Sequence, residues 1–253
     1  TLDLRPEYQP LFEPFAGWNW CLSNPETVKL QKALIAEMHE TFGNPPFFHI
    51  GCDEATYPSC PECTKRPYSE LFVNHISEIN KVLKKRKARP MMWHDMLLRR
   101  GDPRWEGFYA NGTEDTASGF LDFPRDIVIC DWYYGEAHDK YPTLDYFRSL
   151  GFPVLTCPWD NLDGIIAQCG YAHEAGLDGI LGTSWNHTSG DNLINIFLTL
   201  SNAAWKFSPS YEGINRFTFY THLRQVGWDM GLSDPRHAGI WRDEIPKEPS
   251  MNN

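Results

Sequence analysis

The stretch Phe47-Phe48-His49-Ile50-Gly51-Cys52-Asp53-Glu54 decides how this chain is interpreted. It is a short apolar run that follows Pro45-Pro46 and ends in two adjacent carboxylates. Such a run is typical of a strand in a parallel sheet, because other elements cover both faces of that sheet. In a (β/α) barrel the C-terminal edge of the strands carries the catalytic groups. The stretch therefore predicts a buried strand that presents Asp53 and Glu54 at a site, although a strand followed by an ordinary acidic turn fits the same residues.

Composition sets outer bounds on fold and partners. The chain has 253 residues, of which 42% are hydrophobic and 14% aromatic, and a net charge of −10. Barrels of about 250 residues are common, and the acidic balance argues against nucleic acid or an anionic membrane as partner. No apolar run approaches the roughly 20 residues of a membrane span. The chain has 10 Trp and 11 Tyr, whose flat faces and polar edges suit sugar rings, although a large aromatic core explains the same count.

The chain alternates predicted helices and strands without a linker. Asn24 followed by Pro25 indicates a helix start, and this helix should bury Leu30, Leu34, Ile35 and Met38. Further helices are predicted near residues 72–87, 144–150, 171–175 and 191–206. Strands with polar or aromatic ends are predicted within residues 47–54, 90–95, 127–134, 153–161 and 179–187.

Four of the predicted strands end in a tryptophan: Trp93, Trp132, Trp159 and Trp185. In a barrel these indoles would meet at one mouth, so we predict that they line a pocket. Tryptophans that only fill a core should lie inside strands or on helix faces, where we expect Trp205.

Five βα units cannot close a barrel of eight strands. We therefore expect an α/β fold of the (β/α)8 TIM-barrel type, of which this chain carries about the last five units in residues 1–206. Residues 207–253 are predicted to form a C-terminal helix and tail packed on the barrel. No clear strand precedes residue 47 beyond Thr1 to Leu4, so about three N-terminal strands are expected outside this chain. The chain alone should then be poorly soluble, molten or domain-swapped, because its parallel edges are unpaired.

The seven cysteines show no regular framework, which is typical of reduced, buried thiols in a cytoplasmic protein. Cys60-Pro-Glu-Cys63 has the spacing of half a zinc site, but no second pair completes it. We therefore predict a reduced surface loop, no metal and no cofactor, with a small site that includes Cys52 and His49 as the alternative. The chain begins at Thr1 without a signal-like segment, so we expect a cytoplasmic bacterial protein unless a targeting peptide precedes it. Asn111-Gly-Thr113 matches the glycosylation pattern, which has meaning only in a secretory compartment.

His49-Ile-Gly-Cys-Asp53-Glu54 resembles the His-x-Gly-Gly-Asp-Glu motif of glycoside hydrolase family 20, the β-N-acetylhexosaminidases. The likeness begins upstream at Leu22-Ser-Asn-Pro-Glu-Thr27 and continues through Met92-Trp-His-Asp95, so it covers about residues 2–206. The segments Phe12-Glu-Pro14 and Trp18-Asn-Trp20 are similar to those of a divergent bacterial branch of this family. The resemblance implies removal of terminal β-linked GlcNAc or GalNAc from a glycan or glycoconjugate. In the family, an earlier segment supplies the first three strands and an arginine that grips the substrate.

The family chemistry implies roles for the adjacent carboxylates. In family 20 the 2-acetamido oxygen of the substrate attacks C1 and forms an oxazolinium ion, with retention of configuration. The resemblance implies that Glu54 is the general acid and then the base, while Asp53 orients the acetamido N–H. Two carboxylates so close would raise one pKa, which suits an acid near neutral pH. His49 would support the acids or contact substrate; a buried, hydrogen-bonded histidine is the alternative.

The resemblance also implies a substrate-binding wall. Trp93, Trp132 and Trp185 would hold the acetamido methyl and the sugar face, and Tyr134, or else Tyr133, would bond the acetamido oxygen. The full set of candidate binding residues is His49, Trp93, Trp132, Tyr134, Trp159, Asp160, Trp185 and His187. Asp160 and Asn161 could bind sugar hydroxyls, although an ordinary βα turn explains them too. Many family members place a Glu directly after the last tryptophan, where this chain has Asn186 and His187, so the choice between GlcNAc and GalNAc stays open.

Two other functions fit the sequence. The first is a retaining glycosidase on a non-acetamido sugar, with Asp131 or Asp95 as the partner of Glu54. Most glycosidases place two acids about 5 to 10 Å apart on opposite sides of the sugar. The second is a non-catalytic carbohydrate-binding or vestigial protein, which predicts sugar binding without turnover. The sequence leaves the oligomeric state undetermined.

Overall fold

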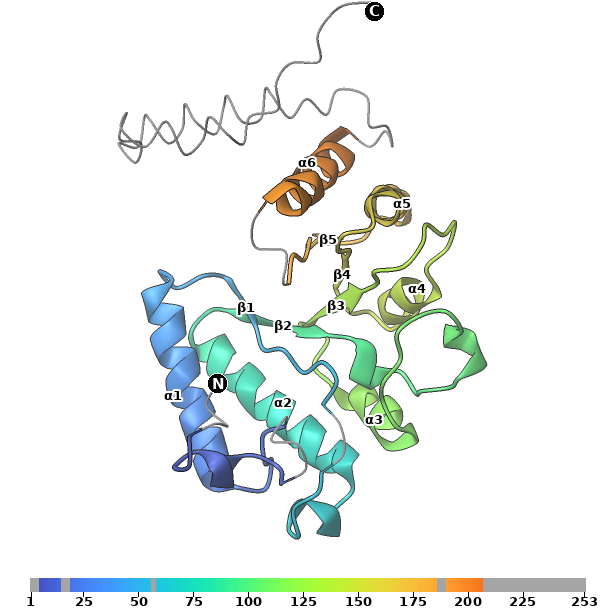
Figure 1. The fold of residues 1–253 in the computed structure, drawn as a ribbon. Helices are drawn as coiled ribbons and strands as arrows, with labels where there is room; N and C mark the ends of the chain where they lie inside the picture. Colours follow the sequence, from blue (N-terminus) through green and yellow to red (C-terminus); the bar gives the residue numbers. More distant parts are fainter. Residues whose placement is uncertain (1–4, 15–18, 56–57, 186–189, 207–253) are drawn as a thin grey trace, which may run out of the picture.

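The computed structural model describes residues 5–14, 19–55, 58–185 and 190–206. Within these ranges, five parallel strands form one sheet in the order β1 (Phe47–His49), β2 (Arg89–Trp93), β3 (Val128–Trp132), β4 (Val154–Cys157) and β5 (Gly179–Ile180). The row of strands curves, and the helices lie on its outer side (Figure 1). The predicted (β/α)-barrel type is confirmed in the form of a curled half-barrel. The predicted strand at Thr1 to Leu4 and the predicted tail at 207–253 lie outside the described residues.

In the described part of the chain, six α-helices connect and flank these strands: α1 (Pro25–Thr41), α2 (Tyr68–Lys85), α3 (Glu114–Gly119), α4 (Pro142–Ser149), α5 (Leu162–Ala175) and α6 (Gly190–Lys206). Helix α1 begins as predicted, with Asn24 Oδ1 accepting the backbone N–H of Glu26 at 3.0 Å. Helix α5 is longer than predicted, because Asn161 Oδ1 caps it at Gly164 N and two internal glycines obscure its apolar pattern. None of the helices in the described ranges is both long enough and apolar enough to cross a bilayer.

Side chains along each strand alternate between two cores, as the period of two requires. The outer core lies between sheet and helices and contains Ile76 of α2, Ile129 of β3 and Phe147 of α4. The inner core lies on the concave side and contains Trp93, Cys130, Trp132 and Cys157. Successive residues of a strand therefore face the helices and the concave side of the sheet in turn.

The predicted packing of α1 is only partly correct. Ile35 is buried as predicted, but Met38 is 46% exposed, and Thr27 and His39 are buried as well. The reason is that α1 packs on α2 and on the N-terminal segment, where Thr27 Oγ1 donates to Leu11 O at 3.0 Å. Trp205, expected on a packed helix face, is 82% exposed near the end of α6.

Candidate active site

The acid pair lies in a turn directly after β1 whose backbone is strained. Gly51, Cys52 and Glu54 all have positive φ, at 73°, 75° and 45°. Glycine adopts this region freely, but other residues cost of order 1–3 kcal/mol there and persist only when their surroundings fix them. Glu54 is exposed and Asp53 is half-buried. The turn therefore depends on contacts with the rest of the sheet edge.

Asp95 supplies the main contact that fixes this turn. It is fully buried just after β2. Its Oδ2 accepts the backbone N–H of Glu54 and the side-chain amide of Asn111, each at 2.9 Å, and its Oδ1 accepts Trp132 Nε1–H at 3.2 Å. Sequence reasoning considered Asp95 only as an alternative catalytic partner and missed this positioning role. The side-chain nitrogen of Asn111, to which a glycan would be attached, donates a hydrogen bond to Asp95 in this structure.

Electrostatics separates the acids from ordinary surface carboxylates. Burial, and then the charges of Asp95 and Asp53, raise the pKa of Glu54, while Arg100 lowers it. Burial is also the main cause that raises the pKa of Asp53; its own backbone N–H opposes this shift, Asp95 adds to it and His49 opposes it. A raised pKa keeps Glu54 protonated to higher pH, which a general acid requires.

His49 lies on the concave side of β1. Its ring packs on the Trp93 indole with 4.3 Å between centroids, and its Nδ1 accepts the backbone N–H of Gly51 at 3.1 Å. Its Nε2 is buried and has no hydrogen-bond partner within the described residues. The ring thus supports the acid turn through one nitrogen and directs the other into the interior.

The aromatic residues predicted to form a wall lie together. Tyr134 packs against Trp132 and Trp159, with centroids 5.0 and 5.3 Å apart, and Trp93 packs against Trp185 at 5.8 Å. Trp185 Nε1–H donates to Tyr134 Oη at 2.7 Å. Trp93 and Trp132 are buried, whereas Trp185 is 49% exposed and has a φ of 41°. The wall thus joins the ends of β2, β3, β4 and β5.

Sequence reasoning missed one member of the wall. Tyr109 stacks on Trp132 with centroids 4.2 Å apart and ring planes 22° apart. It comes from the polar segment between β2 and β3 rather than from a strand end, so the strand-end pattern could not reveal it.

The structure distinguishes the two tyrosines considered for the acetamido group. Burial chiefly raises the pKa of Tyr134, and the charge of Asp53 adds to this shift, so the phenol lies within electrostatic range of the acid pair. Tyr133, the preceding residue, points to the other face of the sheet and belongs to the outer core. Its hydroxyl is hydrogen-bonded to His138 Nε2 at 2.7 Å. Tyr134 is therefore the tyrosine on the side of the wall.

The remaining predicted residues lie in other places. Asp160 is exposed in the turn after β4, next to Asn161, whose side chain caps α5. His187 lies outside the described residues. Asp131 is buried on the helix side of β3, and its Oδ1 lies 3.3 Å from His94 Nε2. Because His94 Nδ1 accepts the backbone N–H of Trp132, its Nε2 carries the proton toward Asp131 and Tyr109 O.

A cavity of about 350 Å³ adjoins Asp53 on the side of α1 and α2. Its lining includes Trp20, Gln31 and His75, and none of the tryptophans of the wall. Burial, and then the charge of Lys32, lower the pKa of His75 to about 4, so this ring is neutral at physiological pH.

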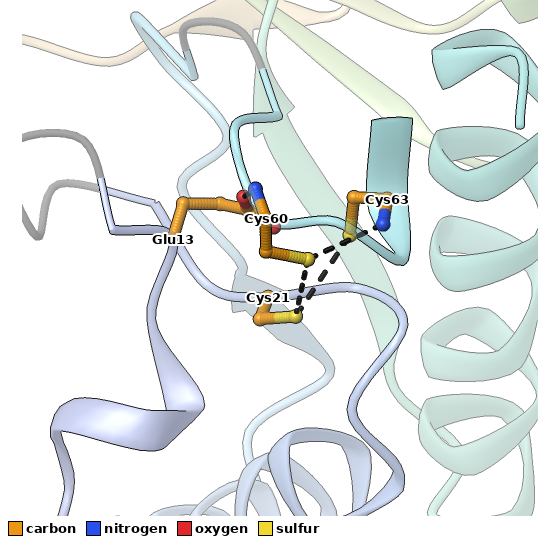
Figure 2. A group of neighbouring side chains, drawn as sticks. All are labelled: Glu13, Cys21, Cys60 and Cys63. Atoms are coloured by element: carbon orange, nitrogen blue, oxygen red, sulfur yellow. Dashed lines mark hydrogen bonds between the residues drawn. The ribbon is translucent and has the colours of Figure 1, made fainter. Parts of the chain in front are cut away.

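Cys60 and Cys63 are free thiols, as predicted for a reduced loop, but the predicted surface position is wrong for Cys63. Cys63 is only 1% exposed, and Glu13 and Cys21 lie against both cysteines (Figure 2). The pattern was not visible in the sequence, because Cys21 lies 39 residues before Cys60. Cys52 and His49, the alternative partners, do not belong to this group.

A parallel sheet that presents carboxylates beside packed indoles at its C-terminal edge is the arrangement of a barrel-type glycoside hydrolase. Within that class, residues 12–134 match the model of the catalytic domain of glycosyl hydrolase family 20. The matched segment includes β1, β2, β3 and the acid pair.

Two curated relatives carry the name Hexosaminidase D. The chain is 26% identical to that of Homo sapiens over 148 residues, which cover 53% of this chain and 28% of the relative. It is 28% identical to that of Bos taurus over 142 residues, which cover 51% of this chain and 37% of the relative. The chain thus spans about a third of the length of these relatives.

Two solved structures share the fold. Dispersin B superposes with a TM-score of 0.53 at 16% identity and covers 81% of this chain and 65% of its own. The β-N-acetylhexosaminidase from Bacteroides fragilis superposes with a TM-score of 0.53 at 15% identity, covering 84% of this chain and 46% of its own.

Proposed function

We propose that this protein is a retaining β-N-acetylhexosaminidase that uses the acetamido group of its substrate as the nucleophile. The observation that carries the proposal is the turn at Asp53 and Glu54, which Asp95 ties to the aromatic wall through Glu54 N–H and Trp132 Nε1–H. The names of the curated relatives agree with this class of activity.

The positions of the other carboxylates favour the substrate-assisted mechanism over a two-carboxylate one. Asp95 accepts three hydrogen bonds from protein groups and is fully buried. Asp131 faces the helices, on the other side of the sheet from the wall. Neither carboxylate that could have served as a nucleophile opposite Glu54 is available to a sugar at the wall, so the nucleophile is left to the substrate.

Each group then has a defined task. Glu54 protonates the departing glycosidic oxygen and later takes a proton from the attacking water. Asp53 accepts a hydrogen bond from the acetamido N–H and stabilises the positive charge that grows there. Tyr134 donates a hydrogen bond to the acetamido oxygen, and Trp93, Trp132 and Trp185 enclose the methyl group.

We assign the sugar to the wall rather than to the cavity beside α1 and α2. The wall offers flat indole faces at the carboxyl ends of four strands, and Glu54 is exposed. The cavity is bounded by helix side chains such as Tyr68 and Phe72 and lies on the other flank of the acid turn.

A comparison of two substrates tests the proposal. The protein should hydrolyse an aryl β-N-acetylglucosaminide with retention and leave the matched aryl β-glucoside unchanged. A thiazoline analogue of the oxazolinium intermediate should inhibit it competitively. Equal hydrolysis of both glycosides without thiazoline inhibition would support the two-carboxylate mechanism, and sugar binding without turnover would support a carbohydrate-binding role.

A further inference from the structure

We propose that Glu13, Cys21, Cys60 and Cys63 form a structural zinc site with three sulfur ligands and one oxygen ligand. Their ligand atoms all lie within 4.8 Å of one another. The four side chains come from two separate segments and point toward one another (Figure 2). None of them has a part in the chemistry at Asp53 and Glu54.

The sulfur spacing matches a tetrahedral ion. Cys21 Sγ lies 3.6 Å from Cys60 Sγ and 3.8 Å from Cys63 Sγ. With Zn–S bonds of about 2.3 Å, neighbouring sulfurs of a tetrahedral site are about 3.8 Å apart. A disulfide would need an S–S bond of about 2.05 Å and could join only two of the three thiols. A single ion accounts for all three.

Glu13 is oriented as a fourth ligand. The residue is 3% exposed, and its Oε2 accepts the backbone N–H groups of Ser59 and Cys60, each at 2.6 Å. Its Oε1 is buried and has no hydrogen-bond partner within the described ranges. An unpaired carboxylate oxygen in the interior is costly, and a cation would satisfy it. The two N–H groups fix the carboxylate as outer-sphere partners fix metal ligands.

The backbone prearranges both halves of the site. Phe12 and Trp20 form an antiparallel bridge and stack with centroids 4.5 Å apart, and Glu13 and Cys21 each directly follow a member of this bridge. In the other half, the backbone N–H of Cys63 donates to Cys60 Sγ at 3.2 Å, so the Cys-x-x-Cys turn already folds around a sulfur. Because few groups must become ordered when the ion binds, the site favours tight binding.

The donor set selects zinc and a structural role. Sulfur ligands favour zinc over calcium or magnesium, which prefer oxygen. All four positions are filled by protein atoms, so no position is open for catalysis. The ion would join the bridged residues around Phe12 and Trp20 to the Cys60–Cys63 turn, which precedes α2.

Metal content of the full chain, purified without chelator, is the first test. We expect one zinc ion per chain, lost in the double variant Cys60→Ser/Cys63→Ser. Glu13→Gln removes a charged direct ligand, so it should weaken zinc binding by more than the about 10- to 100-fold that the loss of an outer-sphere partner costs. Cys169→Ser is the matched control, because Cys169 is as buried as Cys63, at 1% exposure, but lies in another core. Zinc that remains bound in the double variant would overturn the proposal.

Two measurements on the unaltered chain keep the test independent of whether the variants fold. Cobalt(II) added to the metal-free chain should give the charge-transfer and visible bands of tetrahedral thiolate coordination. Alkylation should label Cys21, Cys60 and Cys63 only after a chelator is added. A folded chain without zinc and without the cobalt spectrum, or with Cys21 in a disulfide, would overturn the site.

Discussion

The carboxylates at the C-terminal edge of the sheet fall into two pairs with opposite surroundings. Asp53 and Glu54 lie in a strained turn after β1, and Glu54 is exposed. Asp95 and Asp131 are buried by β2 and β3; Asp95 holds three donors, and Asp131 pairs with His94 on the helix side. Residue type and strand-end position are therefore insufficient to identify a catalytic acid. What distinguishes the pairs is access to solvent, since Asp95 and Asp131 are buried within the protein and Glu54 is exposed.

Glu54→Gln should produce the largest change. We expect activity on glycosides with poor leaving groups to fall by about 10²- to 10⁴-fold, because a general acid contributes that much, while activated aryl glycosides are affected less. Steady-state rates on both substrate types measure the difference. Glu106→Gln, an exposed glutamate away from the site, is the control. Equal losses on both substrate types would remove Glu54 from the acid role.

Asp53→Asn should lower kcat on N-acetyl substrates by about 10²- to 10³-fold with a modest change in KM. The proposed contact strengthens as charge develops on the acetamido group, so it belongs to the transition state. Full kinetics with an aryl β-N-acetylglucosaminide measure both constants. A near-normal kcat would contradict the substrate-assisted mechanism.

Asp95→Asn should act mainly on stability. The asparagine amide would face a donor where the carboxylate oxygen accepted one, at an expected loss of about 1–3 kcal/mol in the free energy of unfolding. Denaturant titration measures this loss. Asp145→Asn is the control, since Asp145 is exposed and accepts only the Tyr171 hydroxyl among the described side chains. An unchanged midpoint for Asp95→Asn would show that the buried network does not support the acid turn.

Cys52→Gly should be more stable than Cys52→Ala by about 1 kcal/mol, because both lose the sulfur but only glycine adopts a φ of 75° freely. The same pair of substitutions at Cys169, inside α5, should show the reverse order, since alanine is the better helix former. Thermal unfolding of the four variants gives both differences. Alanine as the more stable residue at both positions would argue against strain in the turn.

Arg100→Met should shift the pH profile slightly. Burial and the charges of Asp95 and Asp53 raise the pKa of Glu54, and Arg100 opposes them. Without Arg100 that pKa rises further, so the protonated acid persists to higher pH and the alkaline limb of kcat/KM moves upward. Arg99→Met is the control, because Arg99 pairs with Glu114 at 3.2 Å. A shift to lower pH would contradict the assignment of Glu54 as the acid.

Most of the fold could be predicted from local sequence patterns. Apolar runs located the strands, and Asn24 with Pro25 located the start of α1, because these signals depend on neighbours in sequence. The buried face of α1 was predicted only in part, since it depends on which elements pack against the helix. The extent of α5 was underestimated because its capping residue, Asn161, also suits a turn.

The site was predictable where it follows strand ends and unpredictable where it depends on long-range contacts. The tryptophan-bearing ends of the strands do lie at one edge, as parallel topology requires. Tyr109 and the bonds to Asp95 depend on how the segment between β2 and β3 folds back. The grouping of Glu13 and Cys21 with Cys60 and Cys63 depends on contacts across 39 to 47 residues.

The hydrogen bond from Trp185 to Tyr134 has a direction, and the direction has a consequence for selectivity. An indole N–H can only donate, so the phenol oxygen is the acceptor. The hydroxyl proton of Tyr134 must then point to another acceptor. The hydrogen bond from Trp185 to Tyr134 and the one that Tyr134 donates therefore run in the same direction and strengthen each other. On the proposed mechanism the second of these bonds ends at the acetamido oxygen. A deacetylated sugar has no acetyl oxygen, so it would leave the Tyr134 hydroxyl without this acceptor. The tryptophan would thus make the site discriminate against deacetylated sugars through the orientation it imposes on its neighbour.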